Sequence, residues 1–491
     1  MALRSIKHPP TQLIKPNTAL QWIQVAKGAP YFVTEGGEDW TPIGQNDAIT
    51  WPELQGLFRR KDFSVAEAYL QMLASHGVTC LRLMLEYCHG ENRYFEKPAG
   101  RFVPNMVKLW DDLFILCEKW GLRILLTPYD TFWMWLRWSH HPYHKRNGGP
   151  CDKRNQWLLC KDTRTAIKQR LSFATERWGG SGALFAWDIW NEIHPAHGGD
   201  SVKGFGEFVA EISSFLRETE LRLHGRAHPQ TVSVFGPVLQ KDPEAAECIF
   251  RHSALDFASV HFYESGTIDH PKNTIDAAIS TGRLTREALA HVQDNRPFFD
   301  SEHGPIHTFK DKKKTLPEPF DDEYFRHMQW AHMASGGAGG GMRWPNRHPH
   351  SLTAGMRKAQ QALSRFLPLL NWHGFHRKNP NNEIQISNPA LAVFGCGDAG
   401  QAIMWLLRTD TITKAGTLNK KADALSACAH LPGLQPGQYR ITAWDTTTGT
   451  TVKTFDLIHS GDSPLCVPIP PVQTDLALAI TRISDKANGA V

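Results

Sequence analysis

The sequence repeats one local pattern, in which an amphipathic helix ends at a glycine and a short apolar strand follows. Residues 64–76 carry apolar side chains at helical spacing and stop at Gly77, and an apolar segment of strand length follows at 78–85. The same order returns between residues 107 and 128. Because strands joined through helices cross over right-handedly and pair in parallel, this rhythm predicts a parallel sheet built from βαβ units.

Eight strands of this kind can be counted before residue 350. We expect a first strand that ends at Asn46, followed by strands at residues 78–85, 122–128, 184–193, 230–236, 257–263, 297–301 and 340–344. Eight parallel strands that alternate with helices predict an α/β fold, the (β/α)8 TIM barrel. The barrel is expected to occupy residues 1–370, with an N-terminal hairpin before the first strand and the last helix at residues 351–370.

Beyond residue 370 the apolar periodicity changes from about 3.6 to about 2 residues. Short segments at 383–386, 391–394, 402–407, 439–444, 451–455 and 476–480 have the character of strands. They predict a C-terminal all-β sandwich domain over residues 371–491. We interpret this domain as a structural cap on the barrel, with a sugar-binding module as the alternative.

Composition excludes several classes of partner. The chain is 41% hydrophobic and 21% charged, as globular proteins are, and no apolar run approaches the roughly 20 residues of a membrane span. A net charge of +5, from 54 basic and 49 acidic residues, is too small and too dispersed for a nucleic-acid surface. We expect an uncharged partner, because the 17 tryptophans are suited to stacking on sugar rings. The sequence does not indicate an oligomeric state.

The cysteines and the N-terminus indicate in which cellular compartment the protein is expected. Nine cysteines, without CxxC spacing, argue against a complete disulfide framework and against a zinc ribbon. Cys80 and Cys117 fall in apolar segments and are interpreted as buried thiols. The first residues lack the apolar core of a secretory signal, so we expect a cytoplasmic protein unless a signal has been removed.

Two apolar strands end in a glutamate. Glu192 closes the run that starts at Leu184, and Glu302 closes the run that starts at Arg296. Taken alone, each glutamate could be the first solvated residue after its strand. Because parallel barrel strands open their C-terminal ends onto one face, we expect the two carboxylates to face each other across a cleft. Glycoside hydrolysis needs such a pair, with one acid to protonate the leaving oxygen and one carboxylate to attack the sugar or activate water.

The segments around these glutamates resemble a known family. Phe185-Ala-Trp-Asp-Ile-Trp-Asn-Glu192 and Phe298-Phe-Asp-Ser-Glu-His-Gly304 are similar to segments of glycoside hydrolase family 5 and, more broadly, of its clan of retaining (β/α)8 glycosidases. The resemblance implies that Glu302 is the nucleophile and Glu192 the general acid/base of a double displacement. In such enzymes the two carboxyl groups lie roughly 5 Å apart.

A cation is expected beside the nucleophile. Arg82 is the one charge within an apolar strand, and we expect it to pair with Glu302 and hold it ionised. A structural ion pair of Arg82 with Glu86 or Asp188 is the alternative. Asn191 is expected to contact the sugar hydroxyl beside the reacting carbon, in a bond that strengthens in the transition state.

His261 and Tyr263 are two residues apart on one predicted strand, so both side chains can point into the mouth of the barrel. By the resemblance, the tyrosine donates a hydrogen bond to the nucleophile and the histidine lines the site. A buried, satisfied histidine–tyrosine pair without a catalytic role is the alternative.

Further substrate-binding residues are expected at other strand ends. Trp344 matches the sugar platform of the family, with a core aromatic as the alternative. Asp130 stands where many members carry a histidine, which leaves that contact in doubt. Trp133 and Trp135 are expected to compensate as stacking surface or to support their loop. Asn46 completes the set.

The connection at residues 129–163 is unusually long and is expected to form a wall of the cleft. It contains His140, His141 and His144, which are interpreted as surface histidines because no carboxylate or cysteine stands at ligand spacing. We expect no metal and no cofactor.

These features together predict a retaining β-glycoside hydrolase that acts on β-linked oligosaccharides or glycosides of the β-mannan or β-glucan type. A cytoplasmic location favours short-chain or exo-acting hydrolysis. The alternative is a non-catalytic carbohydrate-binding barrel or sandwich protein. A lyase or aldolase would need a Schiff-base lysine or a metal cluster at the strand ends, and the sequence suggests neither.

Overall fold

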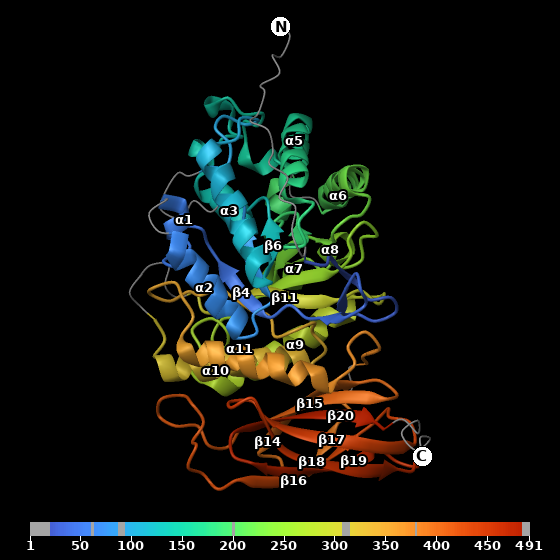
Figure 1. Ribbon diagram of the computed structural model, residues 1–491. Coiled ribbons are helices and arrows are strands. Elements are labelled where there is room, and N and C mark those ends of the chain that lie inside the picture. Colours follow the sequence, from blue (N-terminus) through green and yellow to red (C-terminus); the bar gives the residue numbers. More distant parts are fainter. Residues whose placement is uncertain are drawn as a thin grey trace.

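A computed structural model describes residues 20–59, 63–86, 94–198, 202–306, 315–378 and 381–483. Its largest sheet is parallel, with the strand order β8-β7-β6-β5-β4-β12-β11-β10-β9 (Figure 1). The strands are β4 (Gly44–Asp47), β5 (Cys80–Met84), β6 (Arg123–Thr127), β7 (Leu184–Asp188), β8 (Gln230–Thr231), β9 (Ser233–Phe235), β10 (Ala258–Phe262), β11 (Phe298–His303) and β12 (Met342–Arg343). Only Val232 separates β8 from β9, so these two are halves of one strand and the sheet closes. The predicted TIM barrel is confirmed.

Helices surround the barrel. They are α1 (Gln55–Arg59), α2 (Phe63–Ser75), α3 (Pro104–Trp120), α5 (Lys161–Trp178), α6 (Lys203–His224), α7 (Gly236–Lys241), α8 (Ala245–Ile249), α9 (Thr274–His291), α10 (Glu318–Ala334) and α11 (Ala354–Phe366). Helix α3 has a proline in its first turn and ends at Gly121, whose φ of 73° is the left-handed conformation that glycine favours. None of the described helices is long and apolar enough to cross a membrane.

A small antiparallel sheet closes the N-terminal end of the barrel. It consists of β1 (Ile23–Val25), β2 (Phe32–Thr34) and β3 (Asp39–Trp40). Phe32 packs edge-on against Phe185, Phe257 and Phe299, which lie where β7, β10 and β11 begin. Because aromatic rings fill this end, the opposite, C-terminal ends of the strands are where a functional site can form.

The long connection after β6 folds into short helices. It contains α4 (Thr131–Leu136) and the 3₁₀ turns η1 (Trp138–His140), η2 (Lys145–Asn147) and η3 (Arg154–Gln156). The interpretation of its histidines as surface residues is wrong for His141, which is 2% exposed. Its Nε2 lies 3.3 Å from Glu86, a carboxylate that Arg170 also contacts, so a buried polar network supplies the partner that water would otherwise provide.

The C-terminal domain is a sandwich of two antiparallel sheets. One has the order β13-β16-β19 and the other β14-β15-β20-β17-β18. The strands are β13 (Gln385–Ile386), β14 (Leu391–Gly397), β15 (Gln401–Arg408), β16 (Leu425–Leu431), β17 (Gly437–Asp445), β18 (Thr450–His459), β19 (Leu465–Val472) and β20 (Asp475–Arg482). Cys428 and Cys466 form a disulfide between β16 and β19, whereas Cys80 and Cys117 are free and buried as expected.

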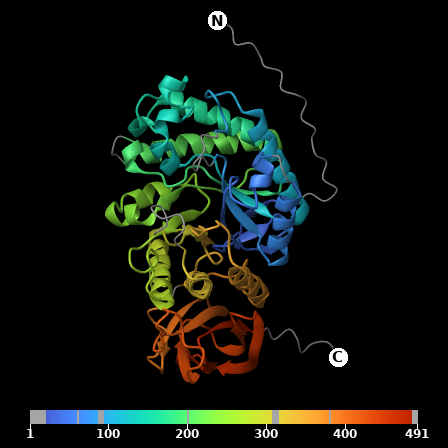
Figure 2. The ribbon, with the colours of Figure 1, turned by 90° about the vertical axis from the view of Figure 1, so that its left-hand side faces the viewer.

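Helices α10 and α11 lie between the barrel and the sandwich in both views (Figures 1 and 2). Trp330 of α10 and Phe366 of α11 share one hydrophobic cluster with Trp405 and Trp444 of the sandwich. The ring of Phe366 lies edge-on to that of Trp444, with centroids 6.0 Å apart. The sandwich therefore rests on the barrel through a continuous apolar interface.

Candidate active site

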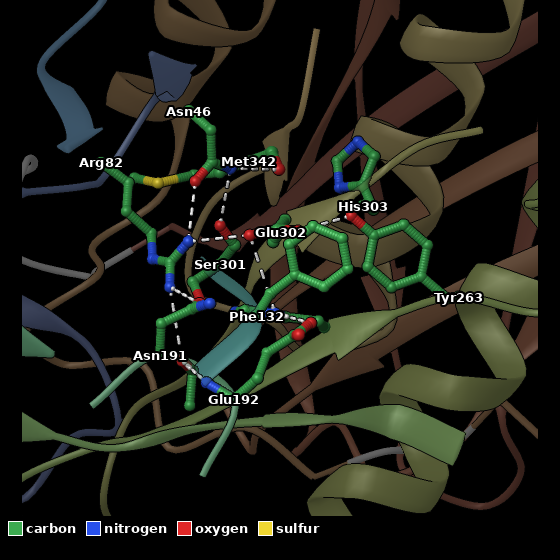
Figure 3. Close-up of polar contacts among 12 residues, drawn as sticks. Asn46, Arg82, Phe132, Asn191, Glu192, Tyr263, Ser301, Glu302, His303 and Met342 are labelled. Carbon is green, nitrogen blue, oxygen red and sulfur yellow. Dashed lines mark hydrogen bonds and ion pairs between the residues drawn. The ribbon is translucent and has the colours of Figure 1, made fainter. Parts of the chain in front are cut away.

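Glu192 and Glu302 lie together at the C-terminal ends of two barrel strands (Figure 3). Glu302 belongs to β11, and Glu192 follows the end of β7. A carboxylate oxygen of one lies within 4.8 Å of a carboxylate oxygen of the other. Retaining glycosidases place their carboxyl groups about 5–5.5 Å apart and inverting enzymes about 6.5–9.5 Å apart, so the spacing suits a retaining pair.

The backbone at Glu192 is unusual. Its φ of 50° is left-handed, and among the described residues only His270 shares this property without being a glycine. Such a conformation costs about 1–3 kcal/mol and persists where neighbouring contacts hold it. Ser233 of β9 supplies one contact, because its Oγ accepts the backbone N–H of Glu192 at 3.3 Å. The chain turns here so that the glutamate side chain faces the strand ends.

Arg82 joins the two sides of the site. Its Nη1 donates to Glu302 Oε2 at 2.9 Å, and its Nη2 donates to Asp188 Oδ2 at 2.7 Å. The expected pairing with Glu302 and the alternative with Asp188 are therefore both present. Arg82 is 1% exposed and is not among the described residues that line the cavity, so it holds the groups that face the substrate.

Two asparagines hold the Arg82 guanidinium. Asn191 Oδ1 accepts from Nη2 at 2.5 Å, and Asn46 Oδ1 accepts from Nη1 at 2.9 Å. The Asn46 amide nitrogen donates to the backbone carbonyls of Ser301 and Met342. Asn46 is 1% exposed and lies behind Arg82, away from the described lining of the cavity, so the structure makes it a positioning residue.

Asp130 and Asn191 continue the ladder beyond β6 and β7 as an isolated parallel bridge. Asp130 Oδ1 accepts a hydrogen bond from Asn191 Nδ2. Both residues line the cavity, so the position that carries aspartate in place of histidine belongs to the site.

Tyr263 contacts Glu302, and His261 lies between the two glutamates, 3.8 Å from Glu302 Oε2 through its Nδ1. The Tyr263 hydroxyl donates to Glu302 Oε1 at 2.6 Å, and His261 Nδ1 lies 2.8 Å from Glu192 Oε1. The register between β10 and β11 shifts between Val260 and His261, so that His261 pairs with Glu302 across the sheet. This irregularity brings both side chains to the carboxylates.

The surroundings make the two carboxyl groups different. Burial raises the pKa of Glu192 from 4.5 to about 7. Burial and the charge of Glu192 raise the pKa of Glu302, whereas Arg82 and the hydrogen bond from Tyr263 oppose the increase. Burial lowers the pKa of His261 to about 4, so its ring is neutral near pH 7. Glu302 therefore has a cation and a phenol to stabilise its charge, whereas Glu192 has a neutral imidazole.

A cavity of about 380 Å³ contains both carboxylates. The residues that line it are Met84, Asp130, Phe132, Asn191, Glu192, Phe235, Tyr263, Glu302, Pro305, Ile306, Trp344 and Asn346. Trp344 also packs edge-on against Trp51, with ring centroids 5.1 Å apart. It therefore lines the cavity and also packs against a small hydrophobic cluster.

Trp135 is not among the described lining residues of this cavity. It lines a neighbouring hollow of about 600 Å³, and the Arg154 guanidinium lies 3.7 Å from the centre of its ring. The side chain of Trp133 falls outside the described residues.

Sequence reasoning missed most of the apolar lining. Phe132, Phe235 and Ile306 each lie at or shortly after the end of a barrel strand, and that position was the only signal available. It also missed Asp300, whose Oδ1 accepts the backbone N–H of Glu302 at 3.2 Å.

Two groups of described residues have the geometry of metal ligands. Cys428, His430 and Cys466 form one, but its two sulfur atoms are joined in the disulfide. The other consists of Glu192, His261 and Glu302. Arg82 already places a positive charge 2.9 Å from Glu302, which disfavours a second cation at this group.

Comparison with known proteins gives a clear result for the fold only. The sequence matches no protein-family model and no curated protein. A solved structure described as a glycoside hydrolase shares 12% identity with this chain, covers 94% of it and 97% of its own length, and has a TM-score of 0.61. A glycoside hydrolase family 5 structure from Bacteroides vulgatus ATCC 8482 has 11% identity, 96% coverage of both chains and a TM-score of 0.60.

A third structure is the endo-β-1,4-mannanase from Thermotoga petrophila. It has 12% identity, covers 89% of this chain and 98% of its own, and has a TM-score of 0.51. At these identities the likeness concerns the arrangement of the backbone. The chain thus shares the fold of a glycoside hydrolase of family 5 along nearly its whole length.

Proposed function

We propose that this protein is a retaining β-glycoside hydrolase that acts on β-linked oligosaccharides or glycosides. The observation that carries the proposal is the pair Glu192 and Glu302, with carboxylate oxygens within 4.8 Å, at the strand ends of a barrel that family 5 structures share. The Thermotoga petrophila match is named a mannanase, which supports β-mannan fragments as the first substrates to try, with β-glucan fragments as the comparison.

In the first step, Glu302 attacks the anomeric carbon and Glu192 gives its proton to the leaving oxygen. A covalent glycosyl-enzyme forms and the aglycone leaves as an alcohol. In the second step, Glu192 removes a proton from water, the water oxygen attacks the anomeric carbon, and the bond to Glu302 breaks. Two inversions return the original configuration.

The surrounding residues prepare these steps. Arg82 and Tyr263 stabilise the ionised form of Glu302, and the buried Glu192 keeps its proton near neutral pH. Asn191 holds Arg82 and lines the cavity, so it can reach a hydroxyl of the bound sugar.

The test is a screen of aryl β-glycosides and of manno- and gluco-oligosaccharides, with the anomer of the first product read by NMR before it mutarotates. We expect retained configuration. Glu302→Gln should abolish turnover while the circular dichroism spectrum stays that of the wild type.

Glu264→Gln is the matched control. Glu264 also follows a barrel strand, but it pairs with Arg283 and is not among the described lining residues of the cavity. We expect this variant to remain active. Inverted product, or full activity in Glu302→Gln, would contradict the proposal. Binding of oligosaccharides without any hydrolysis would favour the non-catalytic carbohydrate-binding alternative.

A further inference from the structure

Among the described residues that line the catalytic cavity, polar side chains gather at the carboxylates, and Tyr263, Trp344 and Asn346 add a hydroxyl, an indole N–H and an amide. Asp130, Asn191, Glu192 and Glu302 come from the strand ends and their immediate extensions. Polar groups in such sites fix the orientation of a sugar through its hydroxyls. This cluster is suited to one sugar ring bound at the reacting carbon.

The remaining lining is mostly apolar. Met84, Phe132, Phe235, Pro305 and Ile306 contribute side chains without hydroxyl or amide groups. A second sugar could stack on the rings of Phe132 and Phe235, but hydroxyls turned toward Met84, Pro305 or Ile306 would lose water without a partner on these side chains, which is costly. An apolar group gains free energy in the same place because its surface leaves water.

The apolar surface continues out of the cavity along α4. Phe132 is 37% exposed and Leu136, one helical turn further on, is 56% exposed, so the two lie on one face of the helix. Phe132 lines the catalytic cavity, and Leu136 lines the neighbouring hollow. Trp135 and Trp138 give that hollow its apolar side, and the rest of its described lining is polar: Ser139, Asp152, Lys153, Arg154 and Asn155. Helix α4 therefore joins the two hollows through exposed apolar side chains.

We infer that the natural substrate is a β-glycoside whose leaving group is an alkyl chain, with the sugar at Glu192 and Glu302 and the chain against Phe132 and onward to Leu136. This inference rests on the proposed glycosidase activity and names its substrate class. Hydrolysis then releases a free sugar and a long-chain alcohol, with the proton from Glu192 on the alcohol oxygen.

The experiment compares methyl, butyl and octyl β-glycosides of the sugar that the aryl screen selects, below the concentration at which micelles form. The three alcohols are similar leaving groups. Differences in kcat/KM therefore report contacts between the alkyl chain of the substrate and the protein. A methylene transferred from water to an apolar surface strengthens binding by up to about fourfold. We expect kcat/KM to rise from methyl to butyl and again from butyl to octyl.

Two leucine variants test where the alkyl chain of the substrate binds. Leu136→Ser should lower the ratio of octyl to methyl hydrolysis, because it replaces the apolar contact at the outer end. Leu221→Ser is the matched control, since Leu221 is 49% exposed on α6 and is not among the lining residues of either hollow. We expect the wild-type ratio in this control.

The outcomes separate the two proposals. Hydrolysis of aryl glycosides or oligosaccharides with a flat alkyl series, or with rates that rise with the number of sugars, overturns the alkyl substrate and leaves the glycosidase activity in place. An octyl-to-methyl ratio unchanged in Leu136→Ser overturns the path along α4. No hydrolysis of any β-glycoside by folded protein overturns the glycosidase and the alkyl substrate together.

Discussion

Glu192 combines a buried carboxyl group with a left-handed backbone. Both conditions are unfavourable for an ordinary glutamate, and contacts from Ser233 and His261 hold the residue in place. Strain and a raised pKa at the same residue are features that functional sites concentrate. Glu192, to which we assign the proton transfer, thus combines two features that are unusual for a glutamate.

This assignment predicts a pH dependence. The acid must be protonated to serve the leaving oxygen, and burial raises the pKa of Glu192 to about 7. We therefore expect kcat/KM to fall as the pH rises through about 7, by tenfold per unit on the alkaline side. A pH profile on one aryl glycoside measures this, and an alkaline limb that persists in Glu192→Gln would assign the ionisation to another group.

Stability should change in the same variant with a definite sign. Between pH 4.5 and about 7 the folded protein keeps a proton on Glu192 that the unfolded chain releases, so the wild type loses stability as the pH rises through this window. Glu192→Gln removes that loss, on the order of 3 kcal/mol. Its melting temperature should exceed that of the wild type at pH 8 but not at pH 4.

Glu264→Gln is the control for thermal unfolding, because the pKa of Glu264 is lowered in the folded protein whereas that of Glu192 is raised. Glu264 is partly buried, yet hydrogen bonds from Ser280 and Thr267 and the charge of Arg283 lower its pKa. Its ionised form therefore favours the folded state, and the amide should not raise the melting temperature at pH 8. An equal rise in both variants would show that the effect is general and not specific to Glu192.

At the scale of the element, β9 supports the site through Ser233. This residue is not among the described residues that line the cavity. Ser233 Oγ accepts the N–H of Glu192 and donates to Asp188 Oδ2 at 2.9 Å, so one hydroxyl links the acid's backbone to the partner of Arg82. The contact exists because the fifth strand breaks at Val232 and resumes as β9.

We expect Ser233→Ala to lower kcat by roughly tenfold, because the Glu192 carboxyl is then held less firmly, and to cost about 1–3 kcal/mol of stability. The measurements are steady-state kinetics and urea unfolding. Ser213→Ala is the control, since it also removes a buried hydroxyl, here one that donates to Gln230 at 2.6 Å, without any contact to Glu192. A loss of stability with unchanged kcat in both variants would contradict the role of Ser233.

Much of the barrel could be predicted because its strands are buried on both faces and read as continuous apolar runs, as Leu184–Asp188 does. Helix α10 is harder to predict, since the barrel and the sandwich cover opposite sides of it and remove the polar stripe that marks a surface helix. Strand β19 is obscured by Pro468, Pro470 and Pro471, which it tolerates because it lies at a sheet edge.

The site was predicted where a charge interrupts an apolar strand, as at Arg82 and Glu302. Asn46 was expected at the site as a substrate-binding residue, but its hydrogen-bond partners could not be predicted. Its amide donates to carbonyls 255 and 296 residues away along the chain, and no local pattern reveals such partners. The apolar side of the cavity could not be predicted either. In the sequence Phe132 and Ile306 look like ordinary loop residues, and only the fold brings them together.

At the scale of the whole molecule, the sandwich and the barrel share a buried ion pair. Arg326 of α10 donates to Asp475 of β20 at 3.0 Å, and Trp405 Nε1 donates to the same carboxylate at 3.1 Å. Despite burial, which alone would raise it, the pKa of Asp475 is lowered by Arg326 and its hydrogen bonds, so the aspartate is ionised.

We expect Asp475→Ala to destabilise the protein by about 3–5 kcal/mol, because it leaves the Arg326 charge buried beside an apolar surface. Urea unfolding measures the change. Asp456→Ala is the control: its partner Arg440 is exposed on the same sheet, so little stability should be lost. Equal effects of the two substitutions would mean that the interface does not depend on this pair.

The position of β20 within its sheet has a consequence for synthesis. It lies between β15 and β17, although it follows every other strand of that sheet in the chain. Until residues 475–482 have been made, the nascent sheet lacks its central strand, although β14 and β15, which contact α10, are already present. During that interval β15 and β17 each present an unpaired edge, and such edges are prone to pair with other chains until β20 fills the gap between them.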